Sequence, residues 1–299
     1  MKKKKISVFD VVLNLFLILF CACFVIPLIL VIAASFTSEE ALVFGGFNLI
    51  PKEFSLDAYV SAFRNVERMI RAYVITAGQA VLGTLISSVI AGMMAYPLSR
   101  TNFRFKKVLT WFVFFTMLFS VGMIPRYIVL AKYYGLKDNF LIYILPGMAG
   151  GAWNTMIYRT FFKSLPESLF ESARMDGAKE FTVFFKIVVP LSTPVFASIS
   201  FLTLVGKWND YSTSMIYIDN ENLYTLQFLL QRLMKEAEFL KQLATDSELG
   251  GGLDISNMTL PSESLKYAMC VIAAGPMLVI FPFFQKYFSK GLTVGAVKG

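Results

Sequence analysis

The chain has 299 residues, of which 56% are hydrophobic and only 16% are charged, and its mean hydropathy is +0.62. Soluble domains are usually about 45–50% apolar and about 25% charged, so this composition indicates a protein whose solvent is lipid. The formal net charge is +8, but the basic residues are spread between the apolar runs and form no single patch. This distribution argues against a nucleic-acid-binding protein.

The residue inventory also excludes several kinds of chemistry. Histidine is absent, which removes a Ser-His-Asp triad and histidine metal ligands. Cys21, Cys23 and Cys270 lie in apolar runs without the spacing of a zinc site. No G-x-x-x-x-G-K-[ST] motif occurs, so the chain has no P-loop for ATP. We therefore expect no catalytic residue, no metal and no cofactor on this chain.

Six apolar windows are long enough to cross a bilayer, which takes ~20 mostly apolar residues for a hydrocarbon core of ~30 Å. In chain order they are Val11–Ala34, Ala72–Leu98, Val108–Leu130, Leu141–Phe162, Val188–Val205 and Tyr267–Phe284. The first window exceeds the ~7–15-residue apolar core of a signal peptide, so we expect it to remain as a helix. The prediction is an all-α polytopic membrane protein with six transmembrane helices.

The segments between the windows alternate in charge. Lys and Arg are about twice as dense in one set of segments (1–10, 99–107, 159–188 and 285–299) as in the other (35–71, 126–140 and 206–266). Cytoplasmic segments are the basic ones. We therefore expect both termini in the cytoplasm, with residues 1–10 as the N-terminus, residues 11–299 as a single transmembrane domain, and residues 285–299 as a cytoplasmic tail.

The outer segments differ from one another. Residues 35–71 predict a compact loop with a short helix near Leu56–Val66. The long outer loop, residues 206–266, is acidic and contains apolar residues at helical spacing over Leu226–Lys241, which predicts a helix there. Its glycine run, Gly250 to Gly252, predicts a flexible stretch.

The cytoplasmic segment 163–188 predicts two short helices joined at a glycine. Ser164 and Glu167 have the spacing of a capping box that would begin a helix of ~12 residues ending at Asp176. Gly177 would supply the left-handed C-terminal cap, and a second helix would run from Ala178 to Pro190. A stripe of Leu165, Leu169 and Ala173 gives this segment an apolar side. From this pattern alone, an interfacial helix without a partner is an equal alternative.

The spacing within the segment resembles a known motif. Glu171-Ser172-Ala173 is followed by Gly177, then by Ile187 after nine residues and by Val189-Pro190. This resembles the Glu-Ala-Ala loop of bacterial ATP-binding-cassette importer permeases, with departures at Ser172 and Val189. In that family the loop is a coupling helix that docks on the ATPase subunit. The resemblance implies docking residues here at Glu171, Ala173, Arg174, Asp176 and Gly177.

Further segments resemble the carbohydrate-importer permeases, a maltose-permease-like group. They are Ala95–Arg100, Ile124–Tyr127, Gly135–Asn139, Ile144–Pro146, Trp208–Asp210 and the C-terminal residues from Lys290. The resemblance implies a type I importer permease architecture and is strongest with the branch for complex oligosaccharides. It also implies that the tail reaches the ATPase through Gly295, Lys298 and Gly299.

The resemblance implies a permease subunit that translocates an oligosaccharide by alternating access in the bacterial cell membrane. The implied partners are a second homologous permease in a heterodimer, two ATPase subunits that carry ATP and Mg, and an extracytoplasmic solute-binding protein. The alternatives are the same permease type with a non-sugar solute, such as a peptide, polyamine or phosphate, or a stand-alone secondary transporter. The sequence names neither the sugar nor the subunit that holds it.

Polar and aromatic residues inside the windows or just beyond the end of the fifth are candidates for a sugar pathway, because intramembrane polar groups usually face a cavity or the bundle interior. They are Gln79, Trp153, Asn154, Tyr158, Trp208, Asn209 and Asp210, with Thr76 nearby. Each residue could instead bond a neighbouring helix or anchor at the interface.

Overall fold

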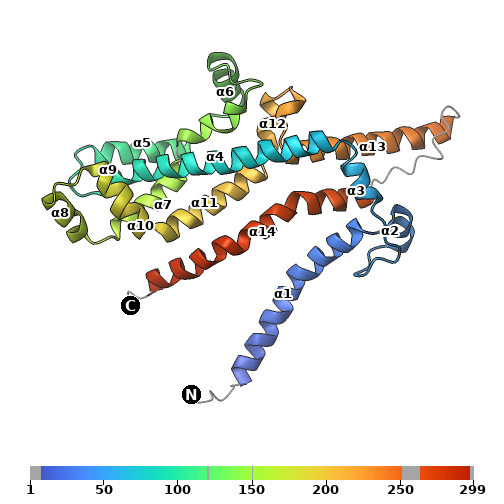
Figure 1. The fold of residues 1–299 in the computed structure, drawn as a ribbon, viewed down its shortest axis with the longest axis horizontal. Coiled ribbons are helices and arrows are strands. Elements are labelled where there is room, and N and C mark those ends of the chain that lie inside the picture. Colours follow the sequence, from blue (N-terminus) through green and yellow to red (C-terminus); the bar gives the residue numbers. More distant parts are fainter. Residues whose placement is uncertain (1–7, 120, 150, 251–262, 297–299) are drawn as a thin grey trace. The chain divides into compact units, whose positions relative to one another are not determined.

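The computed structural model describes residues 8–119, 121–149, 151–250 and 263–296, and these form helices joined by short turns (Figure 1). In the first half of the chain the α-helices are α1 (Val8–Ser35), α2 (Glu39–Gly45), α3 (Asp57–Ala62), α4 (Val66–Ser99), α5 (Lys106–Leu118) and α6 (Met123–Tyr127). In the second half they are α7 (Ala152–Lys163), α8 (Glu167–Met175), α9 (Glu180–Val183), α10 (Val189–Leu191), α11 (Thr193–Trp208), α12 (Ser212–Tyr217), α13 (Leu226–Gly250) and α14 (Glu263–Ala296). Short 3-10 or π segments are η1 (Ile128–Tyr133), η2 (Phe140–Tyr143), η3 (Leu145–Ala149), η4 (Phe184–Val188) and η5 (Glu221–Leu223).

Three helices are each long and apolar enough to cross a membrane, and three bent helix pairs meet the same criterion, which gives up to six spans in the described residues. The single helices are α1, α4 and the Glu263–Gln285 part of α14. The all-α fold is therefore confirmed, and the six-span count fits the structure.

The third, fourth and fifth spans are broken, whereas the sequence predicts continuous helices. The breaks bend the chain by 113° between α5 and Met123–Tyr133, by 45° before α7, and by 82° between Glu180–Leu191 and α11. Gly122 and Gly151 have positive φ angles of 81° and 61°, which end a right-handed helix. Ser192 lies at the third break, between Pro190 and Pro194, and proline lacks the N–H that a continuous helix needs.

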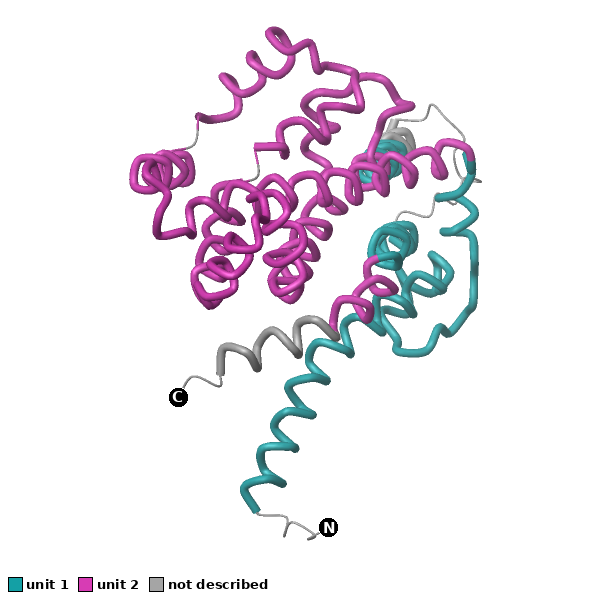
Figure 2. The backbone as a smooth tube through the Cα atoms, turned by 60° about the vertical axis from the view of Figure 1, so that its left-hand side comes forward, with its two compact units in different colours: residues 1–66, 230–276 teal, residues 67–229, 277–299 magenta. Residues whose placement is uncertain are grey.

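The chain divides into two compact units (Figure 2). Unit 1 comprises residues 1–66 and 230–276, and unit 2 comprises residues 67–229 and 277–299. In unit 1 the carboxylate of Glu39, at the start of α2, accepts hydrogen bonds from the backbone N–H groups of Glu263 and Ser264 at 3.0 and 2.9 Å. Glu39 thereby caps the N-terminus of α14, and Lys266 in α14 forms an ion pair with Glu238 in α13 at 3.1 Å.

The outer segments carry the predicted short helices. α3 corresponds to the helix expected near Leu56–Val66, and α13 begins at Leu226 as expected but continues to Gly250. α2 was not predicted, although Ser38 followed by Glu39 and Glu40 is a helix-start pattern, and the Ser38 hydroxyl does accept the Ala41 N–H. The expected flexible stretch after Gly250 lies outside the described residues.

Candidate functional site

The site lies in unit 2, where α8, α9 and α10 gather beside the C-terminal end of α4 (Figure 1). α8 is amphipathic: Phe170 and Ala173 are buried, whereas Glu171, Arg174 and Asp176 are exposed. The buried pair packs into an apolar cluster with α4, α7, η4 and α11, whose members include Ala95, Tyr96, Phe162, Phe184 and Ile199. The short helix is therefore anchored to four other segments.

α8 ends as predicted, with Gly177 after it in the left-handed region at φ 75°. The Gly177 N–H donates to the Arg174 carbonyl at 3.0 Å, and the Ala178 N–H donates to the Ala173 carbonyl at 2.9 Å. These two bonds form a complete Schellman motif, which satisfies carbonyls that would otherwise be orphaned. The turn after α8 is thus fixed by backbone geometry that glycine adopts without strain.

The predicted capping box at the start of α8 is wrong. Ser164 ends α7, and its hydroxyl donates to the Phe161 carbonyl at 2.7 Å. α8 begins only at Glu167, whose carboxylate accepts a hydrogen bond from Arg100 at 3.2 Å. The helix has 9 residues, and Pro166 stands at its N-cap without a side-chain capping bond.

Arg100 is the residue that joins α8 to the membrane helices. Its guanidinium lies 3.7 Å from the centre of the Phe170 ring, and Nη2 donates to the Phe162 carbonyl at 2.6 Å. Burial lowers the pKa of this guanidinium, and the charge of Glu167 raises it. One buried cation thus ties the ends of α4, α7 and α8 together.

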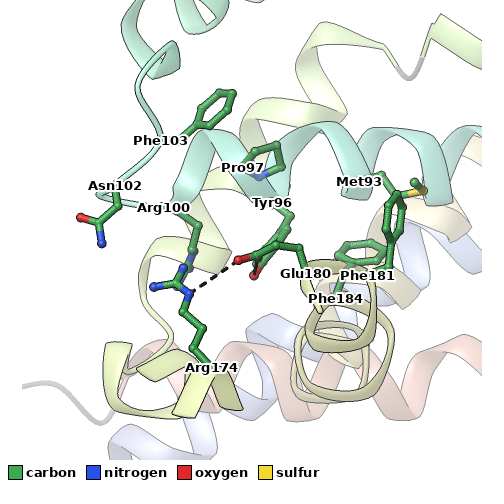
Figure 3. A pocket seen from close by; sticks show the side chains of 10 residues that line it. All are labelled: Met93, Tyr96, Pro97, Arg100, Asn102, Phe103, Arg174, Glu180, Phe181 and Phe184. Atoms are coloured by element: carbon green, nitrogen blue, oxygen red, sulfur yellow. Dashed lines mark hydrogen bonds and ion pairs between the residues drawn. The ribbon is translucent and has the colours of Figure 1, made fainter. Parts of the chain in front are cut away.

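A second polar link crosses the same joint. The Tyr96 hydroxyl in α4 donates to Glu180 at 2.6 Å, and Arg174 in α8 lies 3.5 Å from the other oxygen of that carboxylate. Figure 3 shows these groups around a cavity of about 470 Å³, whose other walls come from Met93, Pro97, Asn102, Phe103, Phe181 and Phe184. The polar groups of this joint thus pair with each other across α4, α8 and α9.

Two exposed apolar side chains near this joint were not singled out in the sequence. Met175, at the end of α8, is 89% exposed, and Phe181 in α9 is 67% exposed. A single exposed apolar side chain is common on protein surfaces and does not by itself mark a binding surface. In the sequence, these two residues could have been found by their position beside the Glu-Ala-Ala-like motif.

The pathway candidates are dispersed, and most of their polar atoms are already bonded. Gln79 donates to the Lys207 carbonyl at 2.6 Å, and Asn209 accepts a bond from Gln227 at 3.2 Å. Asp210 accepts bonds from the Ser212 and Thr213 hydroxyls and from the Thr213 N–H, so it caps α12. 

The other candidates lie in α4, α7 and α11. The Thr76 hydroxyl accepts the Leu226 N–H at 2.8 Å. Trp153 is exposed, and Asn154 donates to the Thr203 hydroxyl at 3.4 Å. Tyr158 is fully buried in the apolar cluster that anchors α8. Trp208 is buried, with its ring centre 6.3 Å from that of Tyr73. These residues are not gathered into either cavity described for this chain, so their role in a sugar pathway stays a prediction.

Lys207, near the end of α11, was not singled out in the sequence, where the fifth window is short and could extend past Trp208. The Lys207 amine donates to the Tyr143 carbonyl at 3.1 Å. Its side chain fills space left by two glycines, since a Cβ at Gly83 would come within 2.7 Å of the amine and one at Gly147 within 3.3 Å. The cation thus locks α11 onto the broken fourth span.

The tail residues are only partly described. α14 continues to Ala296, so the chain is helical at Gly295 and not extended up to that point. Lys298 and Gly299 lie outside the described residues. Contact of the tail with an ATPase stays a prediction.

Residues 83–294 match the family described as the binding-protein-dependent transport system inner membrane component. The chain belongs to this family. It is therefore a membrane protein and a permease subunit of an ATP-binding-cassette importer, a kind of subunit that is not catalytic. Such permeases work together with another permease, ATPase subunits and a binding protein.

Individual relatives cover nearly the whole permease. The polygalacturonan/rhamnogalacturonan transport system permease protein YtcP of Bacillus subtilis is 39% identical over 99% of this chain and 100% of its own length. Protein LplC of the same organism is 37% identical over 98% of this chain and 95% of its own length. A crystal structure of a bacterial ABC transporter that imports the acidic polysaccharide alginate contains a chain with a TM-score of 0.75 and 28% identity, covering 96% of this chain and 99% of that one. These relatives favour a saccharide importer over the non-sugar permease and the stand-alone transporter.

Proposed function

We propose that this permease forms half of the membrane pathway of an importer for acidic oligosaccharides in the bacterial cytoplasmic membrane. The observation that carries the proposal is α8: its inner side is anchored by Phe170, Ala173 and Arg100, while Glu171, Met175 and Asp176 are exposed for a partner. The acidic nature of the substrate is supported by the polygalacturonan/rhamnogalacturonan and alginate transporters among its relatives.

In the proposed assembly a second, homologous permease completes a heterodimer, and two ATPase subunits carry ATP and Mg²⁺. An extracytoplasmic binding protein delivers the oligosaccharide. Both termini and the segment 163–188 lie in the cytoplasm, consistent with the higher density of Lys and Arg in those segments.

The proposed mechanism is alternating access in which α8 acts as a rigid lever. Closure of the ATPases moves α8, and the buried cluster and Arg100 transmit that movement to α4, α7 and α11. Packed interiors transmit strain because they have few voids and low compressibility. Docking on the ATPase would use the exposed side of α8, with the Gly177 turn keeping the orientation of the helix fixed.

The test uses the whole transporter in liposomes with its binding protein. Glu171→Lys reverses an exposed charge without touching the buried anchor, and we expect it to abolish substrate-stimulated ATP hydrolysis through loss of ATPase docking. Gly177→Val should act similarly, since a β-branched residue at φ 75° is strongly disfavoured. Gly177→Asn is the matched control, because asparagine tolerates this backbone region.

Co-purification of the ATPase separates docking from later steps. If both Glu171→Lys and Gly177→Val retain the ATPase and normal stimulated hydrolysis, α8 is not the coupling element. A screen of wild-type transport against neutral and uronate-containing oligosaccharides tests the substrate class independently of these variants.

A further inference from the structure

The bend in the third span encloses a cavity of about 790 Å³, here named the bend cavity. Its walls come from α5, α6, η1, η3 and α12, and the residues that matter for its chemistry are Thr116, Arg126, Ser212, Thr213 and Tyr217. All of these elements belong to unit 2. The volume is within the ~300–1,000 Å³ range of small-molecule sites.

The elements around the bend cavity hold each other in place. The Tyr127 ring of α6 stacks on the Tyr217 ring of α12, with centroids 5.5 Å apart. Leu130 and Ile216 pack against the buried apolar cluster that contains Tyr217. The 113° bend at the α5–α6 break is what separates α6 from the line of α5 and leaves room for the cavity.

Among the described residues that line the bend cavity, Arg126 alone is charged; the others are apolar or carry a hydroxyl. Arg126 forms no hydrogen bond or ion pair with any residue in the described part of the chain. The carboxylate next to the lining, Asp210, accepts bonds from Ser212 and Thr213 and caps α12. The guanidinium is thus left with its donors available toward the cavity.

We propose that the bend cavity is a subsite for a uronate unit of the transported oligosaccharide, with Arg126 pairing to its carboxylate. This inference rests on the proposed function and names the residue that would read the charge of the substrate. A guanidinium presents a planar fork that matches a carboxylate through two parallel hydrogen bonds. The pair is stronger beside apolar walls than in water, because the local dielectric constant is lower. Hydroxyls of Thr116 and Tyr217 offer hydrogen bonds to the sugar ring.

The experiment removes the charge and then restores it chemically in the assembled transporter. In a background with Cys21, Cys23 and Cys270 replaced by Ala, Arg126→Cys is treated with a methanethiosulfonate that carries an aminoethyl group or with its neutral ethyl analogue. Uptake of trigalacturonate into liposomes is the readout. Lys132→Cys, at an exposed cation on η1 that does not line the bend cavity, is the matched control.

We expect Arg126→Cys to raise the KM for trigalacturonate about tenfold, which corresponds to loss of one good ionic contact. The aminoethyl reagent should bring KM back toward the wild-type value, whereas the ethyl reagent should not. Lys132→Cys should respond to neither. Arg126→Lys retains a charge without the planar fork and should give a smaller rise in KM, so the inference stays testable if the cysteine variant assembles poorly.

The inference is overturned if KM is unchanged in Arg126→Cys, or if both reagents have the same effect. It is also overturned if the effect occurs only in liposomes that contain phosphatidylglycerol, because the guanidinium would then serve a lipid phosphate. A wild-type transporter that imports a neutral oligosaccharide but not trigalacturonate would contradict both the subsite and the proposed acidic substrate class, and would leave only the oligosaccharide permease function in place. A wild type that imports no oligosaccharide contradicts the proposed function itself.

Discussion

Arg100 contacts the ends of both α7 and α8 from its place after α4. It is 5% exposed, and its donors reach the Phe162 carbonyl and the Glu167 carboxylate while its plane covers the Phe170 ring. In the sequence, Arg100 follows the second apolar window, in the basic segment 99–107. The sequence does not show which groups its guanidinium binds. Those partners are 62 and 67 residues away in the chain.

Replacing Arg100 by Met should destabilise the permease by about 1–3 kcal/mol, because a buried carbonyl and a half-buried carboxylate lose their donor. Thermal unfolding of the purified permease in detergent measures this. Arg104→Met is the control, since Arg104 is an exposed arginine in the same segment between α4 and α5. Equal melting temperatures for the two variants would contradict the structural role of Arg100.

Asp138 fixes the turn before the fourth span to the start of the outer loop. Its carboxylate accepts the Asn220 N–H at 2.8 Å and the Asp219 N–H at 2.6 Å. The bond from Asn220 is the largest cause that holds the pKa of this carboxyl below its usual value, and burial opposes it. Its folded pKa is depressed, so the stabilisation is present at neutral pH and is lost as pH falls through that lowered pKa.

Hydrogen exchange at the Asp219 and Asn220 amides should therefore show protection near pH 7 that disappears in acid below about 4, the ordinary range for aspartate. In Asp138→Asn the protection should be weaker at pH 7, because the charge-assisted bonds become neutral ones. It should also be independent of pH after correction for intrinsic exchange. A wild-type profile as flat as that of the variant would refute the role of the charge.

At the scale of elements, α4 and α11 approach closely at a glycine. A Cβ at Gly92 would lie 2.7 Å from the Phe196 ring and 3.3 Å from the Phe184 ring. Aromatic rings in a packed cluster cannot retreat as a flexible chain can, so Gly92→Ala should overpack the site and cost about 1–3 kcal/mol.

Denaturation in detergent measures the effect of Gly92→Ala. Gly206→Ala is the control, because no atom lies within 4 Å of a Cβ built there and Gly206 too is a helical glycine, in α11. The structure predicts a lower melting point for the first variant alone. A similar loss in both variants would indicate that the helix pair tolerates no added methyl anywhere, contrary to the contact at Gly92.

α8 shows how local and distant contacts together determine one element. Its end follows from Gly177, whose backbone freedom is a local property, and the prediction there is confirmed. Its start was mispredicted, because Glu167 is drawn to Arg100 on another segment. The buried anchor is Phe170 and not the predicted Leu169, since the direction that α8 faces depends on where α4 and α7 stand.

At the scale of the whole molecule, α8 presents an exposed apolar tip that an ATPase subunit would cover. In a background with the native cysteines replaced, Met175→Cys should react rapidly with a water-soluble maleimide in the isolated permease, since Met175 is 89% exposed. Assembly with the ATPase should slow this labelling at least about tenfold, because docked surfaces exclude water. The labelling rate followed by mass spectrometry is the measurement.

Lys107→Cys is the control for this labelling experiment, since Lys107 is exposed at the start of α5 and outside the predicted docking motif. It should label at a similar rate with and without the ATPase. Undiminished labelling of Met175→Cys in the full assembly would show that α8 docks elsewhere or not at all.

The sequence by itself determined the solvent of this protein, the number of apolar segments, the absence of histidine chemistry and the glycine turn after α8. Each of these follows from composition, segment length or the backbone freedom of one residue. Only the tertiary structure decided the breaks in three spans, the clamp at Arg100, the place of Lys207 between two glycines and the cavity at the α5–α6 bend. Those features depend on contacts between residues far apart in the chain, whose partners a single sequence does not specify.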